Sequence, residues 1–362
     1  MKLRILFSVA VAFLFCSEVL QAAEVIATGL NNPRGIAVGP EGSLYVAEAG
    51  KGGSGPCLAG ERGTVCAGTT GSITRIDLRK GTLERIVSGL PSLAAPDGSE
   101  AIGAHDVSFQ GRGNGYFTIG LGQDPAVRAI FGSIGVNLAH TARFQPNGKW
   151  SPETDLGIYE QQNNPAGGPI DTDPFGILAL PGKVIVADAG GNDLIEIAAN
   201  GTIRTLATFA NRLVPAPPFL GLPAGAMIPM EPVPTTVIQG NDGNYYVGQL
   251  TGFPFPPGAA SIYRVPADGG APVAVLTGFT NIIDIAAGPD GSLYVLEISK
   301  NGLLSGNGVG ALIRVAPNGT RTELVPGELF FPGGLVFGPD GALYVTTGAI
   351  LPGGGSVVRI VP

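Results

Sequence analysis

The chain has 362 residues, of which 44% are hydrophobic and only 14% are charged. The 58 Gly and 31 Pro indicate many short turns, and the few charged residues argue against a fold built from charged surface helices. The net charge of -7, with no local run of basic residues, argues against nucleic acid as a partner.

The first 23 residues match a secretory signal peptide. Lys2 and Arg4 precede an apolar run over residues 5–15, and small residues follow at Ala22 and Ala23. The run is shorter than the roughly 20 residues needed to cross a bilayer. We therefore expect a periplasmic or secreted protein whose mature domain, residues 24–362, has no membrane contact.

Cleavage would leave two cysteines, Cys57 and Cys66, in a glycine-rich stretch. An even number of closely spaced cysteines in an exported protein favours a disulfide. We expect this bond to staple a loop, because the chain offers only two histidines as further metal ligands.

One short phrase recurs along the chain. It reads GPEGSLYV at 39–46, GPDGSLYV at 288–295 and GPDGALYV at 338–345. Weaker copies extend the alignment to six equivalent positions: Tyr45, Phe117, Ile185, Tyr246, Tyr294 and Tyr344. The last two intervals are 48 and 50 residues, and glycine- and proline-rich insertions lengthen the earlier ones.

Each repeat predicts four short strands separated by turn residues, which is typical of a propeller blade. The sixth repeat ends after three strands, at SVVRIVP, and the segment EVIATGL near the start resembles the missing fourth. The sequence thus predicts an all-β protein, a six-bladed β-propeller with four-stranded blades, closed by the N-terminal strand. The repeated phrase itself is interpreted as a turn followed by a core strand.

The insertions fall in two classes of connection that share one face of a propeller: the second-to-third-strand loops and the loops between blades. Elaborated loops on one face of a repeat protein usually form its working surface. We therefore expect ligands to bind at this face.

Two sets of polar residues are candidates for that surface. Three places beyond the aligned positions stand Glu48, Gly120, Asp188, Gln249, Glu297 and Thr347. Near the starts of first strands, or in the DAGGND loop, stand Arg34, His105, Asp106, Asp173, Asp284, Asn192 and Asp193.

The oxygen ligands Glu48, Asp188 and Glu297 suit Ca²⁺, which is the one cofactor that the sequence suggests. The alternative is that these carboxylates form structural ion pairs with the third-strand arginines, which are Arg75, Arg143, Arg264, Arg314 and Arg359. His105 followed by Asp106 also suggests a general base, but no GxSxG motif or further partner supports it, so the catalytic residues stay unknown.

Several loops resemble those of the ScyD/ScyE family of exported β-propellers. The similar segments are NNPRGIAVGPEGSLYVAEAGKGGSGPC, IGLGQDPAVR, NPAGGPIDTDPFG, VADAGGNDL, QLTGFPFPPGAASIYRV and GFTNIIDIAAGPDGSLYVLEI, and they cover nearly the whole mature chain. The resemblance implies a six-bladed propeller of the NHL/gluconolactonase-like superfamily, and a link to synthesis of the pigment scytonemin in the cyanobacterial envelope. The chain has QLTGFP where ELTGFP is more usual, which weakens a metal role for Gln249.

Two functions follow as hypotheses. In the first, the protein is a monomer that binds a small molecule, glycan or protein at its elaborated face. In the second, it is a lactonase or other hydrolase, or a lyase, in which Ca²⁺ at the channel mouth polarises a carbonyl. Superfamily membership alone does not decide between them.

Overall fold

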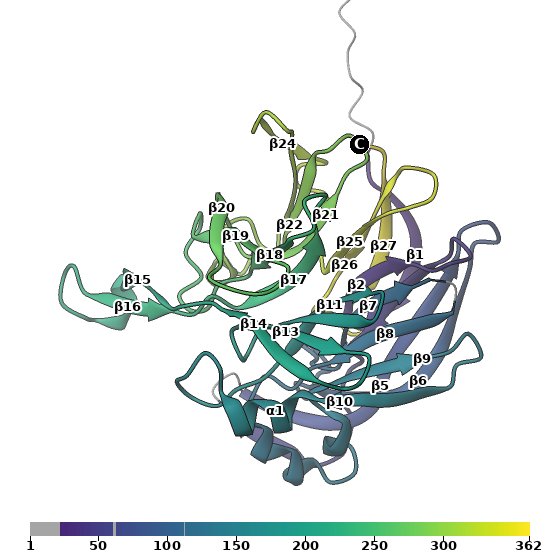
Figure 1. Ribbon diagram of the computed structural model, residues 1–362, viewed down its shortest axis with the longest axis horizontal. Coiled ribbons are helices and arrows are strands. Elements are labelled where there is room, and N and C mark those ends of the chain that lie inside the picture. The colour runs from purple at the N-terminus through teal and green to yellow at the C-terminus, as the bar shows by residue number, and fades with distance from the viewer. Residues whose placement is uncertain (1–21, 61–62, 112) are drawn as a thin grey trace, which may run out of the picture.

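The computed structural model describes residues 22–60, 63–111 and 113–362. The predicted signal peptide therefore lies outside the described residues, apart from Ala22 and Ala23. The described chain forms six four-stranded antiparallel sheets around a central axis, with short extra strands at the insertions (Figure 1). The predicted six-bladed β-propeller is confirmed.

The blades follow one another in chain order, and the four strands of each blade run from the central axis outward. Blade 1 consists of β2 (Pro33–Val38), β3 (Leu44–Glu48), β5 (Gly63–Asp77) and β6 (Thr82–Ala94). Blade 2 consists of β7 (Ala104–Gln110), β8 (Asn114–Ile119), β9 (His140–Phe144) and β10 (Trp150–Asp155). Blade 3 consists of β11 (Pro174–Leu180), β12 (Lys183–Asp188), β13 (Asp193–Ala198) and β14 (Ile203–Thr208). Blade 4 consists of β17 (Pro234–Gln239), β18 (Tyr245–Gln249), β19 (Ala260–Val265) and β20 (Val273–Phe279). Blade 5 consists of β21 (Ile282–Ala287), β22 (Leu293–Glu297), β23 (Ala311–Val315) and β24 (Arg321–Leu324). Blade 6 consists of β25 (Gly334–Phe337), β26 (Leu343–Thr347), β27 (Gly355–Ile360) and β1 (Glu24–Leu30).

The ring closes as the sequence predicts. Strand β1 pairs antiparallel with β27, with Glu24 opposite Arg359. The first strand of the described chain therefore completes the last blade, which removes an open sheet edge.

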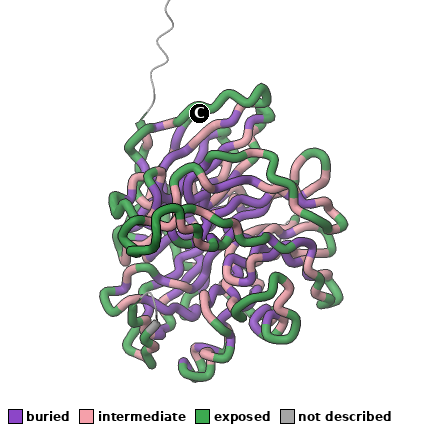
Figure 2. Tube along the Cα trace, turned by 90° about the vertical axis from the view of Figure 1, so that its left-hand side faces the viewer, coloured by how far each residue is buried: buried purple, intermediate pink, exposed green. Residues whose placement is uncertain are grey.

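The inner strands β2, β7, β11, β17, β21 and β25 contact one another in sequence around the axis. Buried side chains fill the spaces between adjacent blades, as where Tyr45 of blade 1 packs against Phe109 and Phe144 of blade 2. The central strands are accordingly buried and the connecting loops exposed (Figure 2).

The repeated phrase forms what we call the turn end of each blade, the tight connection between the inner and second strands. Gly291 adopts a φ of 78°, which favours glycine. The acid of the turn binds the tyrosine of the same phrase and the third-strand arginine, as Asp340 does with Tyr344 and Arg359. This repeated contact supports the structural interpretation of the phrase.

The opposite end of the ring, the insertion end, carries the remaining elements. They are β4 (Cys57–Gly60), η1 (Pro125–Phe131), η2 (Gly135–Asn137), α1 (Leu156–Asn163), β15 (Arg212–Pro215), η3 (Pro218–Leu220), β16 (Met227–Met230) and η4 (Leu303–Ser305). Cys57 and Cys66 form the predicted disulfide across the β4–β5 hairpin. Within the described ranges, no helix is long and apolar enough to cross a membrane.

Candidate functional site

A shift in pairing register recurs near the insertion end of five inner strands, β2, β7, β11, β17 and β21. β-Bulges of this kind re-aim side chains. The residues at this shift include Arg34 in blade 1, His105 in blade 2 and Phe175 in blade 3. The corresponding residues of blades 4 and 5 are Thr235 and Ile283, so the ionisable side chains lie on one side of the ring.

The structure brings the predicted residues Arg34, His105 and Asp173 together. The His105 ring lies 4.4 Å from Phe175, and its Nδ1 atom lies 3.6 Å from Asp173 Oδ1. Arg34 donates a 2.8 Å hydrogen bond to the Ala101 carbonyl. Burial lowers the pKa of Arg34 to about 10, and burial together with the Arg34 charge lowers the pKa of His105 well below its usual value. His105 is therefore neutral at pH 7.

Gly120 leaves space for this cluster because it has no side chain. A Cβ atom at Gly120 would lie 2.3 Å from His105 Cε1 and 2.2 Å from Asp173 Oδ1. Within the described residues, Arg34 Nε and both ring nitrogens of His105 are buried without a hydrogen-bond partner. Such atoms are uncommon in folded proteins and indicate a place where bound water or a ligand would satisfy them.

The sequence alignment of blade 2 is wrong by one residue. Tyr116 lies opposite Arg143 as Tyr45 lies opposite Arg75, so Tyr116, and not Phe117, occupies the aligned position. Ile119 consequently takes the place of Glu48. Phe117 is instead fully buried in the core between blades 1 and 2.

The acids three places beyond the aligned positions cap the start of the inner strand in their own blade. Glu48 accepts the Asn31 N–H at 2.6 Å and Glu297 accepts the Thr280 N–H at 2.7 Å. Asp188 accepts the Asp173 N–H at 2.7 Å. Each carboxylate thus satisfies a backbone donor that would otherwise be buried without a partner.

Gln249 departs from this pattern for a structural reason. In blades 1 and 5 the bonded N–H belongs to Asn31 or Thr280, which lies two residues before the inner-strand residue that pairs with the acid. The equivalent residue in blade 4 is Pro232, which has no N–H. Gln249 Oε1 is buried without a hydrogen-bond partner among the described residues. Blade 4 therefore lacks the backbone donor that Glu48 and Glu297 bind in their own blades.

The structure does not bring Glu48, Asp188 and Glu297 together as one ligand set. They belong to blades 1, 3 and 5, and the described part of the chain contains no group of three or more His, Cys, Asp or Glu side chains that could hold a metal ion.

Within the described chain, the third-strand arginines do not pair with these carboxylates, so the alternative role is wrong. Arg264 and Arg314 pair with the turn acids Asp242 and Asp290, and Arg75 pairs with Glu84. Arg143 pairs with Glu153 and Arg359 with Asp340 and Glu24. These arginines lie toward the turn end of the blades, whereas the capping acids lie at the insertion end.

Asp106 and Asp284 join neighbouring inner strands. Asp106 accepts the Ile177 N–H of the next blade at 2.9 Å, and Asp284 accepts the Leu335 N–H of its next blade at 2.7 Å. Burial and the Asp284 charge raise the pKa of Asp106 well above its usual value, and burial raises the pKa of Asp284 to about 6. These contacts support a structural role in the ring.

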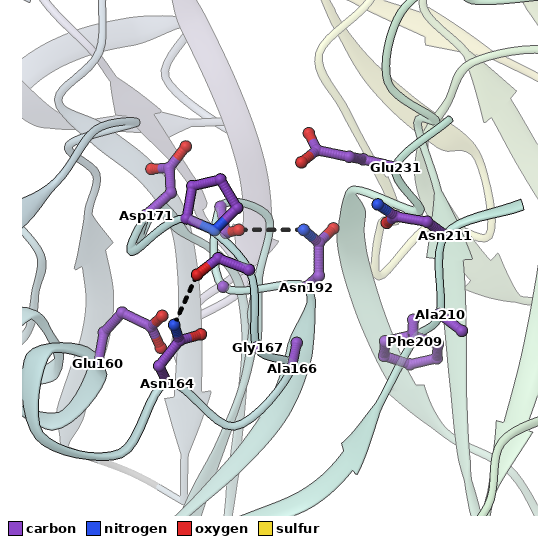
Figure 3. Close-up of a pocket in the computed structure, with 14 residues that line it drawn as sticks. Glu160, Asn164, Ala166, Gly167, Asp171, Asn192, Phe209, Ala210, Asn211 and Glu231 are labelled. Carbon is purple, nitrogen blue, oxygen red and sulfur yellow. Dashed lines mark hydrogen bonds between the residues drawn. The ribbon is translucent and has the colours of Figure 1, made fainter. Parts of the chain in front are cut away.

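A pocket of about 340 Å³ opens on the insertion end beside blade 3 (Figure 3). Its polar lining residues are Glu160, Asn164, Asp171, Asn192, Asn211 and Glu231. They come from α1, the loop that follows it, the β12–β13 loop and the two ends of the insertion between β14 and β17. The described lining contains no Lys, Arg or His.

Acidic side chains are concentrated at this pocket. Burial, with the charges of Asp188 and Asp171, raises the pKa of Glu160 to about 7. Asp193 is fully buried behind the pocket wall, where a Cβ atom at Gly191 would lie 3.5 Å from its Oδ1. Burial and the charges of Asp188 and Glu160 raise the pKa of Asp193 well above its usual value.

Asn192 is the predicted residue that lines the pocket directly. It adopts a φ of 56°, accepts the Val233 N–H at 3.0 Å and donates to the Gly190 carbonyl at 3.2 Å. The bond to Val233 joins the β12–β13 loop to the start of blade 4. Glu160, Asp171 and Glu231 were missed, and the only signal for them was their position in inserted loops.

No family model matches the chain, and no curated protein matches its sequence. Several solved structures share the fold. The PQQ-bound aldose sugar dehydrogenase of Streptomyces coelicolor is 14% identical, with a TM-score of 0.53 over 94% of this chain and 97% of that one. A candidate gluconolactonase is 12% identical, with a TM-score of 0.52 over 94% and 92%. A glucose dehydrogenase is 13% identical, with a TM-score of 0.51 over 94% and 99%.

These similarities define the chain as a six-bladed β-propeller that resembles lactonases and sugar dehydrogenases in fold at low identity. No activity is carried over from them, because a fold shared at this identity hosts many chemistries.

Proposed function

We propose that this protein is an exported binding protein that holds a small amine- or hydroxyl-bearing molecule in the pocket beside blade 3. The observation that carries the proposal is the pocket wall, which presents three carboxyl and three carboxamide side chains and no basic residue within the described lining. Carboxylates and amides accept hydrogen bonds from hydroxyl and ammonium groups.

Charge and shape support the same class of ligand. A cleft with acidic walls concentrates cations, since low-dielectric walls focus the field. Phe209 adds an apolar surface to the lining, against which carbon atoms of the ligand can pack. The volume of about 340 Å³ suits one small molecule.

Calorimetric titration tests this proposal with choline, putrescine and glucose as probes. We expect at least one probe to bind, and Glu231→Gln to weaken its binding about tenfold by removing a carboxylate from the wall. Asp268→Asn is the matched control, because it makes the same charge change at an exposed residue outside the pocket. Binding that Glu231→Gln leaves unchanged would contradict the proposal.

The loop resemblance to the ScyD/ScyE family supports a finer proposal, that the ligand belongs to scytonemin-like secondary metabolism in the cell envelope. Deletion of the gene in the producing organism should then reduce the metabolite, and fractionation should recover the mature protein outside the cytoplasm. An unchanged metabolite level or a cytoplasmic protein would contradict it.

The second candidate function is a hydrolase or lyase, including the Ca²⁺-dependent kind. The observation that favours it is Glu160, whose pKa of about 7 suits a general acid or base at neutral pH. Lactone hydrolysis with Ca²⁺ or with EDTA tests this role. Turnover that is lost in Glu160→Gln would support it, and turnover that persists in that variant would exclude Glu160.

A further inference from the structure

The insertion between β14 and β17 forms an arm, residues 213–230, that projects from the ring (Figure 1). Strands β15 and β16 pair along it, with Leu213 opposite Pro229, and η3 lies between them. From Leu213 to Met230 every residue is apolar, glycine or proline. No other feature of the insertion end is so long and so free of polar side chains within the described chain.

Large apolar side chains of the arm are exposed. Leu213 and Phe219 are each 68% exposed, and Leu222 and Met227 are each 49% exposed. Phe253 of the β18–β19 loop is 40% exposed, and its ring lies 6.2 Å from that of Phe219. The apolar surface thus spans two insertions, whereas exposed apolar residues on ordinary surfaces are scattered singly.

The backbone of the arm is adapted to an environment without water. Five prolines between Leu213 and Met230 remove N–H donors: Pro215, Pro217, Pro218, Pro223 and Pro229. Four other donors are bonded within the arm, those of Ala216, Leu220, Gly221 and Ala226. Unsatisfied backbone donors are costly in hydrocarbon, so this arrangement lowers the cost of burial in lipid.

The charge of the arm and of the whole chain indicates which kind of surface the arm contacts. Protein interfaces usually surround an apolar centre with a polar rim, and residues 213–230 offer no side chain that could form one. The net charge of -7 disfavours an anionic lipid surface. A projecting, uncharged arm fits the interfacial region of a neutral bilayer.

We propose that the arm inserts its Leu213 and Phe219 side chains into a zwitterionic lipid surface and so attaches the propeller to a membrane. This attachment is independent of any ligand in the pocket. It also departs from the expectation that the mature chain has no membrane contact.

Flotation with phosphatidylcholine vesicles tests the proposal on the full mature chain. We expect the wild type to float with the vesicles, and the double variant Leu213→Ser/Phe219→Ser to lose about tenfold or more of its partition coefficient. The control is Val25→Ser/Val273→Ser, which changes apolar residues that are 59% and 60% exposed elsewhere. Wild-type protein that does not float overturns the proposal, as does an equal loss in the control.

Two further measurements separate lipid from other occupants. Phe219→Trp should show a vesicle-dependent blue shift in emission relative to the wild type, whose one tryptophan is Trp150. High salt should leave flotation unchanged, because the arm bears no charge. An unshifted emission spectrum would overturn the proposal. So would a wild-type protein that binds no vesicles but forms a dimer that the arm variant dissociates, because the arm would then contact a second copy of the chain.

Discussion

The two ends of the blades differ in how far equivalent residues recur from blade to blade. At the turn end of blades 4 and 6, an acid, a tyrosine and an arginine recur and bond to one another, as in the contacts of Asp340 with Tyr344 and Arg359. At the insertion end, equivalent positions diverge and leave buried polar atoms of Arg34 and His105 without partners among the described residues. The repeated end builds the ring, and the divergent end holds the candidate sites.

The largest expected effect tests the divergence between two equivalent positions, Glu48 and Gln249. Glu48→Leu should lower the free energy of unfolding by about 3–5 kcal/mol, because it removes the acceptor of the Asn31 N–H, of Ser72 and Thr74 and of Arg85. Gln249→Leu should change it by about 1 kcal/mol or less, since Gln249 Oε1 has no partner among the described residues. Urea unfolding measures both, and equal losses would show that the two positions are not different in role.

An intermediate effect concerns pH and the buried acid Glu160 of the insertion end. Its pKa is raised from 4.5 to about 7 in the folded protein, so between these values the folded state keeps a proton that the unfolded chain has lost. The stability contributed by the protonated carboxyl is complete below about pH 4.5 and is lost as pH rises through about 7.

Glu160→Gln should therefore match the wild type at pH 5 and exceed it in unfolding free energy by about 1–3 kcal/mol at pH 8, after allowance for screening by water in the pocket. The comparison with the variant isolates Glu160 from His105 and His140, whose lowered pKa values act in the opposite direction. Thermal unfolding at the two pH values provides the measurement. A difference between variant and wild type that stays constant with pH would contradict the assignment.

The smallest effect is expected at the turn end. Asp340→Asn weakens one exposed contact to Arg359, in a pair whose side chains are 37% and 28% exposed. The melting temperature should fall by about 3 °C or less, because water screens such ion pairs. A loss as large as that of Glu48→Leu would reverse the comparison between the two ends.

The spacing of the repeats was sufficient to predict the number of blades and the ring closure, whereas the disulfide followed from the close spacing of Cys57 and Cys66. The number of blades and the ring closure depend on local turn chemistry and on strand periodicity, which a sequence displays directly. The meeting of Arg34 and His105 was also predictable, because they occupy equivalent positions in neighbouring blades that lie side by side.

Spacing misplaced blade 2 by one residue and did not identify what the capping acids bind. The Asn31 N–H that Glu48 accepts, and the missing donor at Pro232, depend on backbone geometry at the start of each inner strand. Side-chain identity alone does not show which buried donor needs an acceptor.

The sequence by itself determined the ring, because every blade repeats the same short-range signals. Only the tertiary structure decided the pocket and the arm. Glu160, Asn192 and Glu231 come from separate connections with no shared period, and they meet because the propeller places those connections at one end. The exposure of Leu213 and Phe219 also could not be predicted from the sequence, because an apolar run predicts burial. Only the structure shows that these side chains project from the ring and stay exposed.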